Sequence, residues 1–354
     1  EMRCIMKHFL IFPYDRYIRR SLELASDRLN DSIEDVLSLS GWGWTGDEVF
    51  VKDTIICVKD DICKVSEKCD SIWITESYYA IDFEKFILPI LQFAQKKQWN
   101  VYYGRKTLSE EKRIIMNYIE AEKLFFIEPI KEVKSDEIRL YDLNIPIIWV
   151  VDLLADCPAR NVSFEIVNAL EHKGCFVEYV SKYQDIGICN RIELLPNISK
   201  CSFDESIMML NHYLKRIENK QIDMILVDIP GNLLEASRKL YGDYGTYAYI
   251  MSKVAPPDIV ICNIPYMDRV MENVEDVQNA IYSIIGCRVD FFNFVPYYFD
   301  LLESENTKKF EYVSVSNEFI EKKVGELEDS ISLNSPKMAS KLAEKLIQKL
   351  ECYL

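Results

Sequence analysis

Apolar runs rich in β-branched and aromatic residues alternate along the whole chain with longer amphipathic stretches, and this alternation limits the fold more than any other feature. Strands that alternate with helices pack into parallel sheets, because each helix crosses a face of the sheet to reach the next strand. In the first part of the chain, the runs that we interpret as strands lie at residues 7–14, 32–40, 54–60, 71–77, 100–105 and 124–130.

The second part of the chain repeats this alternation. A strand at residues 146–152, a helix at 162–174 and a strand at 175–183 form a βαβ unit. An amphipathic helix closes the chain at 336–354, with apolar residues at helical spacing. Between these elements, further strands are expected at 224–231, 256–266 and 287–295.

The charged segment 131–146 separates the two parts, has no apolar periodicity and ends in proline, which is typical of a linker. A chain of 354 residues is also long enough for two domains. We therefore predict an α/β protein of two Rossmann-like or P-loop-like domains with mainly parallel sheets. The domains span residues 1–140 and 141–354, and the second is a degenerate P-loop domain that ends in a helix.

The charge of the chain limits its partners. A net charge of −15 disfavours nucleic acid and anionic membranes, because both require a basic surface. No apolar run reaches the ~18 residues needed to cross a bilayer. The apolar stretch near the start of the sequence is too short, and is followed too early by polar residues, for a signal peptide. We expect a cytoplasmic protein with no nucleic-acid or membrane partner; self-association stays open.

The chain has 11 cysteines but only 3 histidines, and no two cysteines form a CxxC pair. Zinc sites usually contain such pairs, so we expect no metal site. The cysteines are interpreted as reduced, small apolar side chains. The regular spacing of Cys57, Cys63 and Cys69 leaves their role open.

The stretch IIWVVDLLADCPARNVSFE, residues 147–165, has the layout of a phosphate-binding loop between a strand and a helix. Such a loop needs glycines, a lysine for the β and γ phosphates, and a Ser or Thr on magnesium. If Ser163 provides that hydroxyl, Val162 stands in the place of the lysine and Asn161 in the place of a glycine. NTPase activity of the usual kind is therefore not expected.

The remaining charges of this loop are mixed. Arg160 is the only cation in the turn, whereas Asp152 and Asp156 would repel a phosphate. The later run MILVDIPG resembles the magnesium-binding strand and γ-phosphate turn of nucleotide hydrolases. Taken alone, it could be a buried strand followed by a turn, but its position after a strand, turn and helix supports the nucleotide interpretation. The residues that we assign to a degenerate nucleotide site are Asp156, Arg160, Asn161, Ser163, Asp228 and Gly231.

A second group of polar residues follows the first predicted strand. Tyr14, Asp15, Arg19 and Arg20 lie at the strand end and the helix start, where open α/β sheets collect ligands. A helix start with arginines can bind a carboxylate or phosphate. The alternative is an ordinary capped helix exposed to water.

The turn GWGWTG places Trp42 and Trp44 between glycines. Glycines permit a tight turn, and two tryptophans are costly to leave in water. The tryptophans therefore either pack beneath the turn or form a recognition surface for a peptide or protein. Both interpretations remain open.

No catalytic residue can be named from the sequence. The histidines at positions 8, 172 and 212 do not accompany a GxSxG nucleophile motif, so a hydrolase triad is not indicated.

Several short pieces together resemble the peptide maturation system proteins, which accompany clostridial-type, cysteine-rich, bacteriocin-like precursor peptides. In such proteins a glycine and a lysine often precede the Phe-Glu pair, whereas Val162 and Ser163 precede it here. The resemblance implies a cytoplasmic accessory role in making a ribosomally synthesised, modified peptide. The pieces that carry it are FPYDRYIRRSLEL, SGWGWTG, Phe164-Glu165, YVSKYQDIG and VDIPG.

Three hypotheses follow. The first is an accessory or scaffold protein, without a required cofactor, that binds the precursor peptide or its modifying enzymes. The second is a peptide-modifying enzyme of the same pathway that uses the cleft between the domains and binds nucleotide and magnesium weakly. The third is an unrelated small-molecule enzyme shaped like a periplasmic binding protein.

Overall fold

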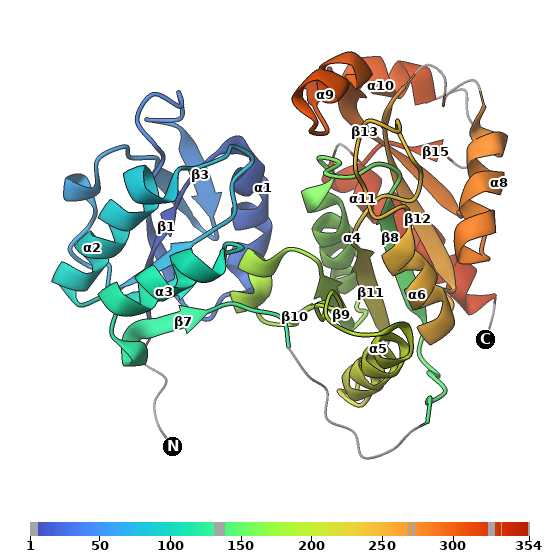
Figure 1. Cartoon of the computed structure of the whole chain (residues 1–354), viewed down its shortest axis with the longest axis horizontal. Coiled ribbons are helices and arrows are strands. Elements are labelled where there is room, and N and C mark those ends of the chain that lie inside the picture. Colours follow the sequence, from blue (N-terminus) through green and yellow to red (C-terminus); the bar gives the residue numbers. More distant parts are fainter. Residues whose placement is uncertain are drawn as a thin grey trace. The chain divides into compact units, whose positions relative to one another are not determined.

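The computed structural model describes residues 6–130, 139–267, 270, 273–324, 330–333 and 335–352. The chain forms two compact units (Figure 1). The first contains Glu1–Pro129 and Tyr183–Leu194, and the second contains Ile130–Lys182 and Leu195–Leu354. This division differs from a single boundary near residue 140, because a short later segment belongs to the first unit. Of the predicted linker, residues 131–138 lie outside the described part of the chain.

The first unit is built on a parallel sheet with the order β2-β1-β5-β6-β7. Its sheet strands are β1 (His8–Phe12), β2 (Ser32–Val36), β5 (Ser71–Ile74), β6 (Asn100–Tyr103) and β7 (Leu124–Phe126). Its helices are α1 (Arg16–Ala25), α2 (Leu88–Lys97), which extends the π-helical turn Phe83–Ile87, and α3 (Ser109–Tyr118). The strand order reverses at β1, so β1 and β5 flank the point where doubly wound sheets bind ligands.

One predicted strand of this unit lies outside the main sheet. β4 (Thr54–Cys57) pairs antiparallel with β3 (Glu48–Val51) in a separate hairpin. Val49 and Ile56 are buried on one face, whereas Phe50 and Ile55 are exposed on the other. A strand in a parallel sheet is buried on both faces, so this one-sided burial suits a hairpin at the surface.

Tyr183–Leu194 joins the first unit through the end of β5 and the residues after it. The Trp73 indole Nε1 is fully buried and donates to the Asp185 carbonyl at 3.0 Å. The Glu76 amide donates to the Asp185 carboxylate at 3.1 Å. The segment contains the turn Gln184–Ile188 and β10 (Ile192–Leu194).

The second unit is built on a larger, mainly parallel sheet. Its inner order is β9-β11-β8-β12-β13, and β14 adds antiparallel to β13. The strands are β8 (Ile147–Asp152), β9 (Val177–Ser181), β11 (Met224–Ile229), β12 (Ile259–Tyr266), β13 (Phe291–Phe299), β14 (Tyr312–Ser314) and β15 (Ser330–Ile331). Every residue of β8 and β12 is buried, as expected for strands covered on both faces.

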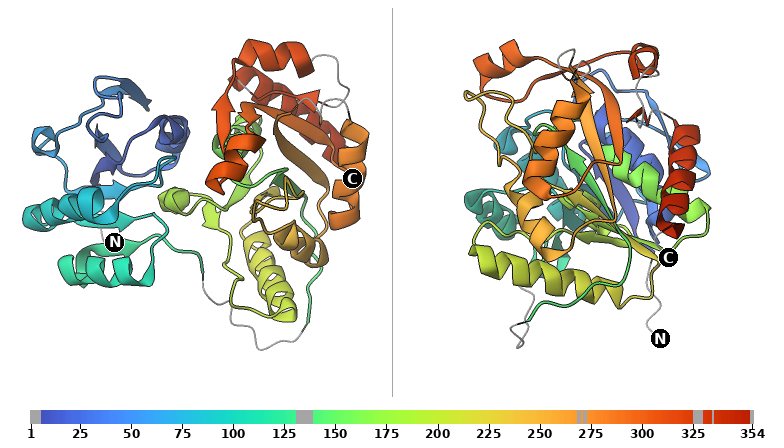
Figure 2. Two further views of the ribbon diagram at one scale, coloured as in Figure 1. Left: turned by 45° about the horizontal axis from the view of Figure 1, so that its top comes forward. Right: turned by 90° about the vertical axis from the view of Figure 1, so that its right-hand side faces the viewer.

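Helices cover both faces of this sheet. Residues of α5, α6 and α8 form one core cluster with the sheet, and α4 packs with α11. Figure 2 (right) shows α8 and α11 on opposite sides of the strands. The helices are α4 (Arg160–His172), α5 (Phe203–Glu218), α6 (Thr246–Val254), α8 (Val274–Ile285), α9 (Leu301–Thr307), α10 (Asn317–Val324) and α11 (Pro336–Glu351). The predicted α/β class with mainly parallel sheets is confirmed.

Among the helices of the described residues, none combines the length and apolarity that a membrane span requires.

Candidate functional site

The predicted nucleotide residues lie at the carboxyl edge of the second unit's sheet, where β8 leads through a turn into α4 (Figure 1). Asp228, at the end of β11, is almost fully buried. Its carboxylate accepts hydrogen bonds from the Ser163 hydroxyl of α4 and the Tyr179 hydroxyl of β9. The structure thus brings together Ser163 and Asp228, which are 65 residues apart in the sequence.

The environment of Asp228 changes its acidity. Burial raises the pKa of the Asp228 carboxyl to about 6, although the Lys182 ammonium and the hydrogen bonds from Ser163 and Tyr179 act in the opposite direction. Burial and the Asp228 charge also raise the pKa of the Tyr179 hydroxyl far above its usual range. Tyr179 therefore remains a neutral donor to Asp228.

A lysine that the sequence interpretation missed completes this group. Lys182 follows β9, and its ammonium forms an ion pair with the Asp152 carboxylate at the end of β8. The two side chains are 13% and 5% exposed. Burial disfavours the charge on Lys182, but the Asp152 and Asp228 carboxylates outweigh it and raise the lysine pKa.

Asp152 also begins a row of polar side chains across three adjacent strands. Asn263 of β12 is in register with Asp152 and donates to its carboxylate at 2.9 Å. Asn293 of β13 is in register with Asn263 and donates to its amide oxygen at 2.8 Å. We call Asp152, Lys182, Asp228, Ser163, Tyr179, Asn263 and Asn293 the buried network. The signal that could have revealed Lys182 is its position at the carboxyl end of a predicted strand. For Asn263 the signal is a single amide side chain inside an otherwise apolar strand.

The turn between β8 and α4 is not open like a phosphate loop. Leu153 and Leu154 are buried, and the Leu153 amide donates to the Asn263 carbonyl at 2.9 Å. Asp156 is exposed, with φ of +52°, and Arg160 is 3% exposed at the start of α4. Asn161 is partly exposed beside it. Apolar side chains therefore occupy a turn that glycines would leave open.

The backbone conformation and the surroundings of residue 231 require a glycine there. Its φ is +91°, and a Cβ atom there would lie 1.9 Å from an oxygen of the Asp243 carboxylate. That carboxylate accepts from the Asn232 amide at 2.9 Å and the Gly245 amide at 3.2 Å. The glycine thus permits a closed loop from residue 231 to residue 245.

The second group of predicted residues lies at the carboxyl edge of the first unit's sheet. Tyr14 and Asp15 follow β1 and are fully buried. Asp15 accepts from the Ile18 amide at 3.0 Å, which caps α1, and from the Tyr78 amide at 2.8 Å. Asp15 therefore connects the loops after β1 and β5, and a partner cannot reach it directly.

The two tryptophans of the glycine turn have different surroundings. The Trp44 ring packs edge-on to the buried Tyr14 ring, with centroids 6.5 Å apart. The Trp42 ring instead packs on Tyr79, with centroids 5.1 Å apart. Tyr78 and Tyr79 are each 46% exposed and follow β5. We call Trp42, Tyr78 and Tyr79 the aromatic surface.

The predicted arginines lie on α1. Arg20 forms an ion pair with Glu23 at 3.0 Å, and Arg19 donates to the Glu48 carbonyl at 3.3 Å. Burial raises the pKa of the Tyr14 hydroxyl to about 12. The positive charge of Arg19, which lies nearby, acts in the opposite direction and lowers this pKa.

The regularly spaced cysteines differ in burial. Cys57 and Cys63 are exposed, whereas Cys69 is buried and burial raises its pKa to about 12. Within the described residues, no group of three or more His, Cys, Asp or Glu side chains could hold a metal ion.

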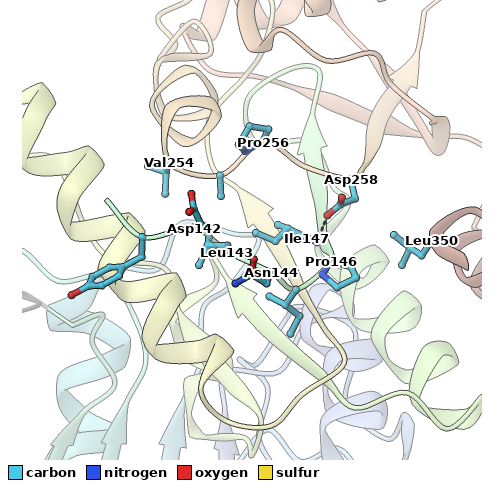
Figure 3. Close-up of a pocket in the computed structure, with 12 residues that line it drawn as sticks. Asp142, Leu143, Asn144, Pro146, Ile147, Val254, Pro256, Asp258 and Leu350 are labelled. Atoms are coloured by element: carbon cyan, nitrogen blue, oxygen red, sulfur yellow. Dashed lines mark hydrogen bonds between the residues drawn. The ribbon is translucent and has the colours of Figure 1, made fainter. Parts of the chain in front are cut away.

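A cavity of about 390 Å³ lies at the opposite, amino edge of the second sheet (Figure 3). It is lined by the segment before β8 and the segment before β12, with Leu350 of α11 nearby. Asp258 in this lining accepts from the Ile147 amide at 2.8 Å. Because doubly wound sheets bind ligands at the carboxyl edge, we assign this region a structural role.

Comparison of the sequence with protein families and with curated proteins gives no match. The fold is similar to that of a DUF1611 family protein from Anabaena variabilis ATCC 29413, with a TM-score of 0.63 and 11% identity. The likeness covers 97% of this chain and 99% of that one, and at this identity it shows the fold alone.

The signal recognition particle receptor FtsY from Elizabethkingia anophelis, in complex with GDP, aligns with a TM-score of 0.28 and 10% identity. It covers 46% of this chain and 52% of that one, and such a low score supports no functional argument. The second unit has a strand, a turn and a helix in the order found in P-loop domains, but its turn lacks the glycines and the lysine of such a loop.

Proposed function

We propose that this protein is a cytoplasmic accessory protein that binds a precursor peptide, or an enzyme that modifies it, during the maturation of a ribosomally made peptide. The short motifs that resemble those of peptide maturation proteins support a role in this pathway. The aromatic surface supports the recognition role, and it is the observation that carries the proposal.

The aromatic surface has the properties of an interface anchor. Tyr78 and Tyr79 are nearly half exposed, and Trp42 packs against Tyr79 in a glycine turn. Aromatic residues that are held in place but reach the solvent contribute much of the binding energy at protein interfaces, because little side-chain freedom is lost on binding. The surface also lies at the strand-order reversal between β1 and β5.

The buried network favours a binding role over nucleotide hydrolysis. Lys182 is engaged by Asp152, and Asp228 already accepts two hydrogen bonds from within the protein. A nucleotide phosphate would have to compete with these carboxylates for the lysine. We expect the purified protein to hydrolyse ATP or GTP no faster than a blank.

A second candidate is a nucleotide-dependent enzyme of the same pathway, since Lys182 supplies a cation at the edge where the loop lacks one. Calorimetry with Mg-ATP and Mg-GTP separates the two candidates. Micromolar affinity that is lost in Asp228→Asn would favour the enzyme.

The recognition role is tested with any cysteine-rich precursor peptide that is found encoded next to the gene. Trp42→Ala and Tyr79→Ala should each weaken binding at least about tenfold, or about 1.4 kcal/mol, with little change in melting temperature. Tyr241→Ala is the control, because Tyr241 is 89% exposed and lies in the second unit. Equal binding by folded wild type and both variants would refute the aromatic surface as the binding site.

A further inference from the structure

A cavity of about 660 Å³ opens at the carboxyl edge of the second unit's sheet. Its wall includes Leu153 and Leu154 after β8, Met267 after β12, Phe299 at the end of β13, and Val277 and Ala280 of α8. The strands and helix that carry these residues are labelled in the second unit in Figure 1. None of these residues belongs to the buried network or to the aromatic surface.

The position of the cavity follows from the strand order. The chain places β9 and β11 on one side of β8, and then passes to β12 and β13 on the other side. The order therefore reverses between β8 and β12. In open α/β sheets, ligands bind at the carboxyl ends of the strands beside such a reversal. Residues after β8 and after β12 both line this cavity.

The size and the lining suit a small organic molecule. Ligand pockets usually have volumes of about 300–1,000 Å³ and mostly apolar walls with a few polar groups. Leu153, Leu154 and Phe299 are buried in the wall and present an apolar surface. The ligand should therefore have an apolar body.

Charge determines which end group such a ligand carries. Among the described residues that line the cavity, Glu235 and Asp276 are acidic and exposed, and none is basic. The first turn of α8 also borders the cavity, and a helix start attracts anions. However, Asp276 lies in that turn and lines the cavity, and its charge opposes this attraction. A positively charged end group is favoured.

We propose that this cavity binds a small amine, with its aliphatic or aromatic body in the cavity and its ammonium group near Glu235 and Asp276. This site is independent of the peptide-binding surface proposed above. Its failure would leave that proposal unchanged, because the two use different residues in different units.

The test uses three probes with the same body and different end groups: 4-phenylbutylamine, 4-phenylbutanol and 4-phenylbutyrate. Titration of the full-length protein, followed by calorimetry or NMR, gives the three affinities. We expect the amine to bind at least about tenfold more tightly than the carboxylate, with the alcohol between them. Binding of the carboxylate as tightly as the amine, or no binding of the amine, would overturn the proposal.

Variants locate the site. The double variant Glu235→Gln/Asp276→Asn should bring the amine and alcohol affinities within about twofold of each other, while the alcohol affinity stays the same. Glu275→Gln is the matched control, because Glu275 lies in the same helical turn, pairs with Arg288 at 3.0 Å and does not line the cavity. An unchanged amine preference in the double variant would place the amine elsewhere and refute the assignment.

A third variant blocks the cavity. Ala280→Phe should weaken all three probes by about tenfold or more, because the added ring fills the space for their common body. Its melting temperature is measured alongside. If Ala280→Phe does not fold, the wild-type series and the charge variants still decide the proposal.

Discussion

The carboxyl edges of the two parallel sheets present different side chains to the solvent, although the strand order of each sheet reverses beside its first strand. In the first unit, the edge carries aromatic side chains that reach the solvent, including Tyr78 and Tyr79 at 46% exposure. In the second unit, the edge carries charged side chains that are withdrawn from the solvent, with Asp152 at 4% and Asp228 at 2% exposure.

This difference gives the carboxyl edges of the two sheets different roles. A partner can bury exposed aromatic rings without breaking contacts inside the protein, so the first edge is suited to recognition. At the second edge, any ligand that binds the charges must first separate Lys182 from Asp152, which is costly in a buried site. The second edge is therefore closed to a ligand by its own ion pair, and the neighbouring apolar cavity is the more accessible place for a ligand.

The largest effect should follow the loss of Lys182. Lys182→Met leaves the Asp152 carboxylate buried without its cation and should lower the free energy of unfolding by about 4 kcal/mol. Urea denaturation measures this loss. Lys239→Met is the control, since Lys239 is 63% exposed in its pair with Glu305 and should cost less than about 1 kcal/mol. Equal losses in the two variants would mean that the buried Asp152–Lys182 pair is no more costly to break than an exposed pair.

The pH dependence of stability should show the titration of Asp228. Burial raises its pKa from 3.8 to about 6, so the folded protein holds this proton more tightly than the unfolded chain does. The Asp228 proton therefore stabilises the folded protein fully below pH 3.8, and this stabilisation is lost as the pH rises through about 6. The change is about 3 kcal/mol. Asp228→Asn cannot titrate, so its urea midpoint should lack this component; identical curves for wild type and variant would contradict the prediction.

Gly231 and Gly174 offer a matched pair. Both have φ of +91°, but a Cβ at Gly231 would collide with the Asp243 carboxylate, whereas a Cβ at Gly174 meets nothing within 4 Å. Gly174→Ala should therefore cost only backbone strain, about 1 kcal/mol. Gly231→Ala should cost about 2 kcal/mol more, because its loop must also open. Thermal unfolding of both variants tests this, and equal melting temperatures would show that the loop adapts freely.

The smallest expected effect distinguishes the two tryptophans of the first edge. Trp44 packs on the buried Tyr14, so Trp44→Ala should lower the free energy of unfolding by about 1.5 kcal/mol, less than a fully buried tryptophan would. Trp42→Ala should change stability by less than about 0.5 kcal/mol, as expected for a surface substitution. The reverse order of stability would make Trp42 part of the core and weaken the recognition proposal.

The alternation of strands and helices was readable from the sequence because periodicity is a local property. Full burial of β8 and β12 is visible in the sequence as the apolar runs IIWVV and IVIC, and the lack of a loop lysine is visible without a structure. The hairpin of β3 and β4 was not predicted, because a short apolar run does not reveal which strand it pairs with.

The sequence by itself determined the α/β class and showed that the loop after β8 lacks its glycines and lysine. Only the tertiary structure decided that Lys182 meets Asp152, and that Tyr79 lies beside Trp42 while Tyr14 is buried. These contacts join residues some 30 positions or more apart. They depend on which strands become neighbours and in what register, and that choice is made by packing over the whole sheet rather than by any local pattern.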